Sequence, residues 1–225
     1  MEQNQHRKTN KFAVLNLKVL KIAVFCISAV FMNILLNIFV MNFLRFPLFL
    51  DTVFNAAITF AFGLIPGIIV AVLSLLLPFI YFEYFHFFIL CSIAEVLLIY
   101  ALKPRAPVIP DFASRERIIA SYTLVAAKLI LLYIICAVSI SILGGIIDFL
   151  PQFLIDTHSH YFSVEYTFKL GLIMNNLPTL AVNILSRIPI LLVDRFIVIF
   201  GGYFISRLIL LGMKSEHFNQ QKKYL

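Results

Sequence analysis

Two ionisable side chains, Glu95 and Lys128, lie deep inside long apolar stretches of the sequence. A charged group is costly at membrane depth, so it normally faces a bundle interior, a cavity or an opposite charge. At ~1.5 Å of rise per residue, the two lie at similar depths in their stretches. The sequence therefore predicts an intramembrane ion pair between Glu95 and Lys128. Because such a pair mainly offsets its own desolvation, structural support between helices is favoured over substrate binding.

A second set of polar residues gathers toward the outer side of the predicted membrane domain. It combines charges of both signs with amide groups, as a pocket for a polar ligand would. The alternative is that the arginines extend to lipid headgroups while Asp51 caps a helix. The candidate substrate-binding residues are Arg45, Asp51, Asn55, Asn175, Asn176, Arg187, Asp194 and Arg195, with Asn183 nearby.

Motifs for catalysis or metal binding are missing from the sequence. It has no GxxxxGK[ST] phosphate loop, no HExxH and no spacing that singles out a Ser-His-Asp triad. His158 and His160, between Asp156 and Glu165, fit a solvated loop better than a metal site, since no third ligand is placed beside them. The sequence predicts no enzyme activity, no metal and no cofactor. The cysteines, which read as small buried hydrophobes, are Cys26, Cys91 and Cys136.

The composition indicates a membrane protein. The 225 residues are 62% hydrophobic and 13% charged, with 24 phenylalanines, and a soluble domain of this length could not bury so much apolar surface. The net charge of +7 comes from basic clusters at the two ends of the chain and in residues 103–117. This is the positive-inside pattern of a membrane protein, so nucleic acid is not an expected partner.

The apolar stretches predict an all-α bundle of six transmembrane helices at 19–42, 51–64, 68–82, 86–102, 118–147 and 188–212. Gly63 and Gly67 mark a tight turn between the second and third of these helices. Residues 170–184 are predicted as an additional helix on the outer surface or partly inserted. Residues 1–18 and 213–225 are then basic cytoplasmic ends of a membrane domain at 19–212. With six helices, every basic cluster faces the cytoplasm of a bacterial inner membrane, which places both termini there.

Small residues in the predicted second span could allow another helix to approach closely. Ala57 and Ala61 are four residues apart, so they share one helix face. Packing within the bundle is the simpler interpretation, and docking of a partner subunit is the more specific alternative.

Two short stretches resemble the substrate-binding (S) components of energy-coupling factor (ECF) vitamin transporters. They are PLFLD at 47–51, which leads into a short second span, and GLIPG at 63–67; IPILLVDRFIVIFGGYFISRLI at 188–209 is also similar to the last span of these proteins. The resemblance implies a six-helix bundle that takes up a vitamin or related micronutrient from outside, with residues 42–50 as a lid. It also implies a transmembrane coupling subunit and two cytoplasmic ATPases as partners.

The first span departs from the AxxxA spacing with which this family often docks its coupling subunit, since Ala23 and Ala29 are six apart. The same architecture also occurs as the input domain of bacterial signalling proteins, so a membrane sensor is the alternative function. The chain ends in a basic tail soon after the last span, without an output domain, which favours transport. A structural membrane protein without a ligand is the third hypothesis.

Overall fold

The computed structural model describes residues 2–40, 42, 50–82, 86–104, 115–154 and 164–222, and the regular structure of this part of the chain is helical. Short 3-10 turns, η2 (Leu50–Thr52) and η3 (His86–Phe88), precede α2 and α4, and a π-helical segment, η4 (Ile197–Gly201), joins α7 to α8. The α-helices are α1 (Glu2–Phe39), α2 (Val53–Phe62), α3 (Leu64–Phe82), α4 (Ile89–Leu102), α5 (Arg115–Leu154), α6 (Val164–Met174), α7 (Thr179–Phe196) and α8 (Gly202–Lys222). The all-α prediction is confirmed.

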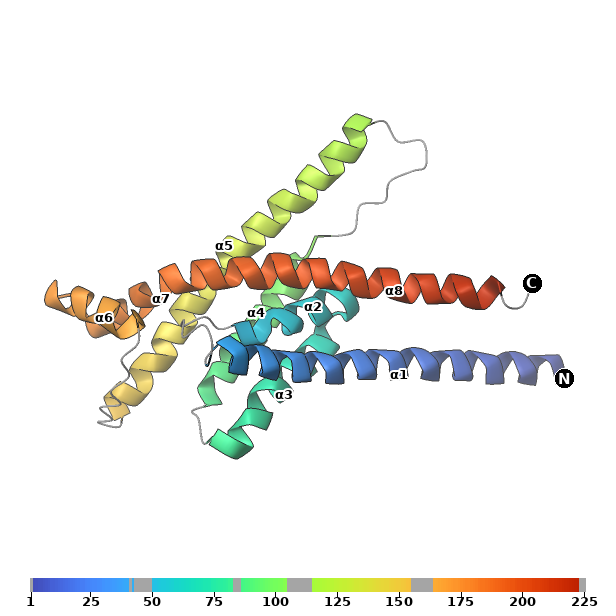
Figure 1. The fold of residues 1–225 in the computed structure, drawn as a ribbon, viewed down its shortest axis with the longest axis horizontal. Coiled ribbons are helices and arrows are strands. Elements are labelled where there is room, and N and C mark those ends of the chain that lie inside the picture. The colour runs from blue at the N-terminus through green and yellow to red at the C-terminus, as the bar shows by residue number, and fades with distance from the viewer. Residues whose placement is uncertain are drawn as a thin grey trace.

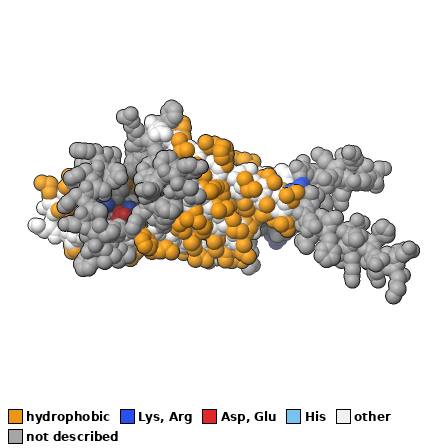
Figure 2. All heavy atoms as spheres, turned by 90° about the horizontal axis from the view of Figure 1, so that it is seen from below, with side chains coloured by type: hydrophobic (Ala, Val, Ile, Leu, Met, Phe, Trp, Pro, Cys, Tyr) orange, Lys and Arg blue, Asp and Glu red, His pale blue; other side chains and the backbone are white. Residues whose placement is uncertain are grey.

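Three helices in the described part of the chain are long and apolar enough to cross a membrane, at Lys18–Phe39, Arg115–Phe149 and Thr179–Lys214. Shorter apolar helices cover Leu50–Phe62, Leu64–Leu77 and Ile89–Leu102. Large apolar side chains are exposed along them, as at Ile27 (70%) and Ile65 (72%), and Figure 2 shows hydrophobic side chains covering the middle of one face. Lipid is the solvent that suits this surface, because helices satisfy their own backbone hydrogen bonds there.

The helices pack around a small core. In Figure 1, α1 and the continuous helix α7–α8 run along the long axis, and both termini lie at the same end. α5 crosses obliquely and packs against α7, while α2 packs against α1, α3 and α8. The largest buried cluster joins side chains of α2, α4, α5 and η4, among them Ala56, Ile99, Leu132 and Val198, each with 0% exposure.

Gly63 forms the turn between α2 and α3, as predicted. Its φ of 95° is a conformation that only glycine adopts without strain, and its N–H bonds to the carbonyl of Thr59. The predicted interval between the second and third helices was too long, because α3 begins at Leu64 rather than at residue 68. Pro66 lies in the first turn of α3, where a missing N–H disrupts no helical hydrogen bond.

The segment before the last span differs from the prediction. Residues 170–184 are not one helix: α6 ends at Met174, Asn175 and Asn176 form a turn, and α7 begins at Thr179. Asn176 has a φ of 57°, which ends the first helix, and Pro178 caps the second. The last long helix therefore starts nine residues before the predicted residue 188 and includes residues 179–184 of the segment assigned to a separate helix.

Close helix contacts depend on small residues. A Cβ added at Gly145 of α5 would lie 2.9 Å from the backbone N and Cα of Ile184 in α7, and one at Gly202 would lie 2.7 Å from the Cβ of Ala56 in α2. Ala57 is fully buried at the same approach of α2 to α8, while Ala61 is partly buried. Ala57 thus packs within the chain and cannot be the partner-docking residue that was considered, because no surface of it is free.

Candidate functional site

A buried ion cluster lies where α4, α7 and η2 meet. Its members are Glu95 of α4, Asp194 and Arg195 of α7, and Thr52 of η2, with exposures of 1%, 0%, 4% and 3%. The Arg195 guanidinium forms an ion pair with Glu95, and its Nε lies 3.1 Å from Oδ2 of Asp194. Its Nη1 also donates a hydrogen bond of 3.0 Å to the Thr52 hydroxyl. One arginine therefore links three elements that are far apart in the sequence.

The cluster contains more acid than base. Asp51, which precedes Thr52 in η2 and is partly buried, also interacts electrostatically with Arg195, Asp194 and Glu95. Three carboxyl groups thus surround a single guanidinium among the described residues. The Oε2 atom of Glu95 is paired with Arg195, whereas its Oε1 accepts no hydrogen bond from the described residues. Such a site has unused capacity for a hydrogen-bond donor or a positive charge.

The local sequence explains how Arg195 reaches this position. Asp194 and Arg195 are consecutive and both buried, and the π-helical segment begins two residues later at Ile197. Val198 and Ile199, which lie inside this segment, are buried in the main core cluster. The buried positions Leu191, Asp194, Arg195, Val198 and Ile199 are spaced at i, i+3, i+4, i+7 and i+8, so one face of the long helix points to the core on both sides of Arg195.

The predicted pair of Glu95 with Lys128 is wrong. Glu95 is paired with Arg195 instead, and the Lys128 side chain is exposed on α5. Equal depth along two helices says nothing about the direction in which each side chain points. Val125, Leu129 and Leu132, the neighbours of Lys128, are the residues with which α5 enters the core.

The predicted set of outer polar residues divides into separate groups. Asp51, Asp194 and Arg195 join the ion cluster, whereas Asn55 belongs to an amide network. Asn175 and Asn176 are exposed in the turn before α7, and Asn183 is buried in α7. Arg45 and residues 43–49 of the expected lid lie outside the described residues, as do His158, His160 and Asp156.

Arg187 takes part in a second ion group between α5, α6 and α7. Its Nε and Nη2 donate hydrogen bonds of 3.0 Å and 2.6 Å to Oδ2 of Asp148, and Lys169 Nζ lies 3.4 Å from the same atom. The guanidinium also lies 5.0 Å from the ring centre of Phe88. A Cβ on Gly144 would come within 2.9 Å of Nη1, so the absence of a side chain there makes room for Arg187. This group ties α7 to α5 and α6.

Asn33 of α1 forms the centre of the amide network and was not predicted. Its Nδ2 donates to Oδ1 of Asn55 at 2.8 Å and to the Ser74 hydroxyl at 3.1 Å, and its Oδ1 accepts from the Phe54 N–H at 3.1 Å. The last bond satisfies a donor in the first turn of α2, whose N-cap residue Thr52 makes no side-chain capping bond. An asparagine in the middle of an apolar span is the sequence signal for this network, because an amide at membrane depth needs a hydrogen-bond partner.

Asn33→Leu is expected to destabilise the bundle by about 1–2 kcal/mol, because it leaves the Phe54 N–H and the Asn55 amide without partners. Unfolding can be followed with a fluorogenic thiol reagent, since Cys26, Cys91 and Cys136 are free and buried. Asn37→Leu, one turn further along α1 and partly exposed, is the control. Equal melting temperatures for the two variants would show that the network adds nothing to stability.

The structure and its buried cluster define a helical protein with several apolar helices suited to a membrane. A comparison with protein-family models, with curated proteins and with solved structures found no significant match. Within the described residues, no group of three or more His, Cys, Asp or Glu side chains is placed to hold a metal ion.

Proposed function

We propose that this chain is the substrate-binding membrane subunit of an ECF-type importer. In this role it captures a vitamin or related micronutrient from the outer face of the bacterial inner membrane. A coupling subunit and cytoplasmic ATPases supply the energy for uptake. The observation that carries the proposal is the nearly complete burial of Glu95, Asp194 and Arg195 inside a bundle with an apolar surface. An ionisable group at membrane depth is by default a candidate functional site, because its burial there is costly.

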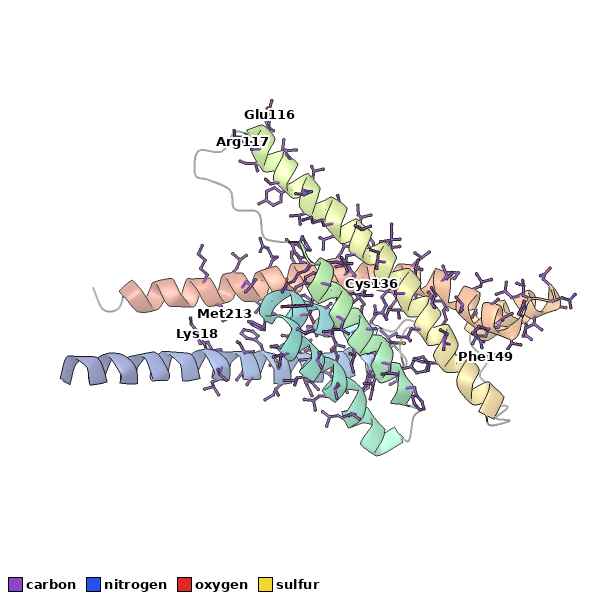
Figure 3. All side chains as sticks on the ribbon, turned by 180° about the vertical axis from the view of Figure 1, so that it is seen from behind. Lys18, Glu116, Arg117, Cys136, Phe149 and Met213 are labelled. Carbon is purple, nitrogen blue, oxygen red and sulfur yellow. The ribbon has the colours of Figure 1, made fainter. Side chains whose placement is uncertain are left out.

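The ends of the three long apolar helices support a cytoplasmic location for both termini. In Figure 3, Lys18 and Met213 lie on the left, Glu116 and Arg117 at the start of α5 lie left of centre at the top of the view, and Phe149 lies on the right. The exposed basic residues Lys18, Arg115, Arg117 and Lys214 belong to the helix ends away from Phe149. By the positive-inside rule these helix ends are cytoplasmic. The α5–α6 connection then lies outside, on the side from which a nutrient arrives.

The composition of the ion cluster supports binding of a polar ligand. The cluster offers carboxylates, a guanidinium and a hydroxyl, which can donate to and accept from one small molecule. The η2 turn contributes Asp51 and Thr52 and begins at Leu50, the last residue of the 42–50 segment that the ECF resemblance assigns to a lid.

Mass spectrometry of small molecules released from the protein tests this proposal. Protein purified from its native membrane is expected to carry a vitamin-sized compound, and Glu95→Gln is expected to lower its occupancy at least tenfold. Glu116→Gln, at the exposed start of α5, should leave the occupancy unchanged. If the wild-type protein carries no compound and a panel of vitamins does not raise its melting temperature, the proposal fails.

A further inference from the structure

Lys128 is an exposed cation on a helix that is otherwise apolar at this level. It lies within the span Arg115–Phe149, and the described residues place no carboxylate against it. The exposed side chains on either side of it along the helix are Leu124 (58%) and Leu131 (55%). The ammonium group is thus presented on a hydrophobic surface, where an uncompensated charge is unfavourable.

The level of Lys128 in the membrane follows from its neighbours. Val125, Leu129 and Leu132 pack in the same buried cluster as Ile99 and Val198. Ile99 is one turn beyond Glu95 in α4, and Val198 is about one turn beyond Arg195. Lys128 therefore lies close to the level of the buried ion cluster, well inside the bundle and away from its basic ends.

We propose that the α5 surface formed by Leu124, Ala127, Lys128 and Leu131 is the docking site for a transmembrane helix of a partner subunit. That helix carries an aspartate or glutamate at the depth of Lys128. The pair neutralises both charges inside the membrane, while the apolar side chains pack around it. Ala127 permits a close approach beside the lysine. The Lys128 surface is distinct from the ligand cluster, because Lys128 is exposed to the surroundings and Glu95 is not.

Among the acidic side chains that the structure describes, none in a second copy of this chain is placed to meet Lys128. Glu95 and Asp194 are buried in the cluster, Asp51 is partly buried beside them, and Asp148 is paired with Arg187. Glu116 is exposed but lies at the first turn of α5, far from the level of Lys128. Charge complementarity therefore points to a different polypeptide with an acidic residue in an apolar helix.

Site-specific photocrosslinking in native membranes tests the docking surface. The full-length chain carries a benzoylphenylalanine at Leu124, or at the exposed Phe204 of α8 as the control position. The adduct at 124 is expected to contain an apolar partner peptide with an aspartate or glutamate. Lys128→Glu is expected to lower its yield at least tenfold, and Lys128→Arg should retain most of it. Changing the partner acid to lysine should restore the adduct in the Lys128→Glu variant.

Three results would overturn this proposal. They are adducts with lipid only, adducts with a second copy of the chain, and a partner adduct whose yield is the same in the Lys128→Glu variant. Lys214→Glu, at the exposed end of the last apolar helix, controls for general effects of charge reversal. The outcome is separable from the proposed function, because an acidic partner helix that belongs to no importer would support this surface and contradict the transport role.

Discussion

Arg195→Met is expected to lower the melting temperature of the protein by roughly 10 °C or more, the largest effect of any single substitution considered. The change leaves Glu95 and Asp194 buried with no cation beside them, and it removes the hydrogen bond to Thr52. Loss of one partner from a buried ion pair costs about 3–5 kcal/mol. For a chain of this size, each kcal/mol corresponds to a shift of roughly 2–4 °C. Labelling of the buried cysteines during a temperature ramp measures the shift.

The combined variant with Glu95→Gln should regain part of this loss, because it removes one of the uncompensated charges. Arg207→Met serves as the control and should shift the transition far less, because it removes a partly exposed guanidinium that lies 5.7 Å from the ring centre of Tyr203. A stable Arg195→Met protein that gains nothing from Glu95→Gln would mean that the ion pair does not hold α4 and α7 together.

Gly145→Ala is expected to destabilise the protein by about 1–3 kcal/mol, although alanine normally favours a helix over glycine by about 1 kcal/mol. The new methyl group would lie 2.9 Å from the backbone of Ile184 and 2.5 Å from its Cγ1. Backbone atoms cannot turn away as a side chain can, so α5 and α7 must separate. The thiol-labelling transition should move to lower temperature.

Gly212→Ala is the matched control, because a Cβ at Gly212 meets no atom within 4 Å. This variant should be neutral or slightly stabilised, so the two substitutions are expected to differ in sign. If Gly145→Ala were as stable as Gly212→Ala, the close contact between α5 and α7 would not exist in the folded protein.

The helices could be predicted from the sequence because apolar stretches and turn residues determine where a helix runs and ends without reference to distant parts of the chain. Gly63 is the clearest case, since its left-handed conformation explains the break between α2 and α3. The start of the last helix was harder, because Asn175, Asn176 and Pro178 suggested a polar segment outside the membrane. These residues form only the turn, and Asn183 beyond it faces the interior at 2% exposure.

The candidate site could be predicted only in part, because sequence spacing gives depth but not direction. The importance of Glu95, Asp194 and Arg195 followed from charges in apolar stretches, and the structure brings these three together. The partner of Glu95 is one hundred residues away along the chain, on a helix whose rotation relative to α4 is set by packing. The role of Asn33 could be recognised only in the folded bundle, because its side chain accepts a hydrogen bond from the Phe54 N–H of another helix.

Purification of the tagged, full-length chain from its native membrane in mild detergent tests the central claim most directly, with co-purifying proteins quantified by mass spectrometry. The transport account predicts a membrane coupling subunit together with ATPase subunits in near-stoichiometric amounts. Recovery of a kinase or a cyclase without any ATPase would contradict that account and make this chain the membrane input of a signalling system.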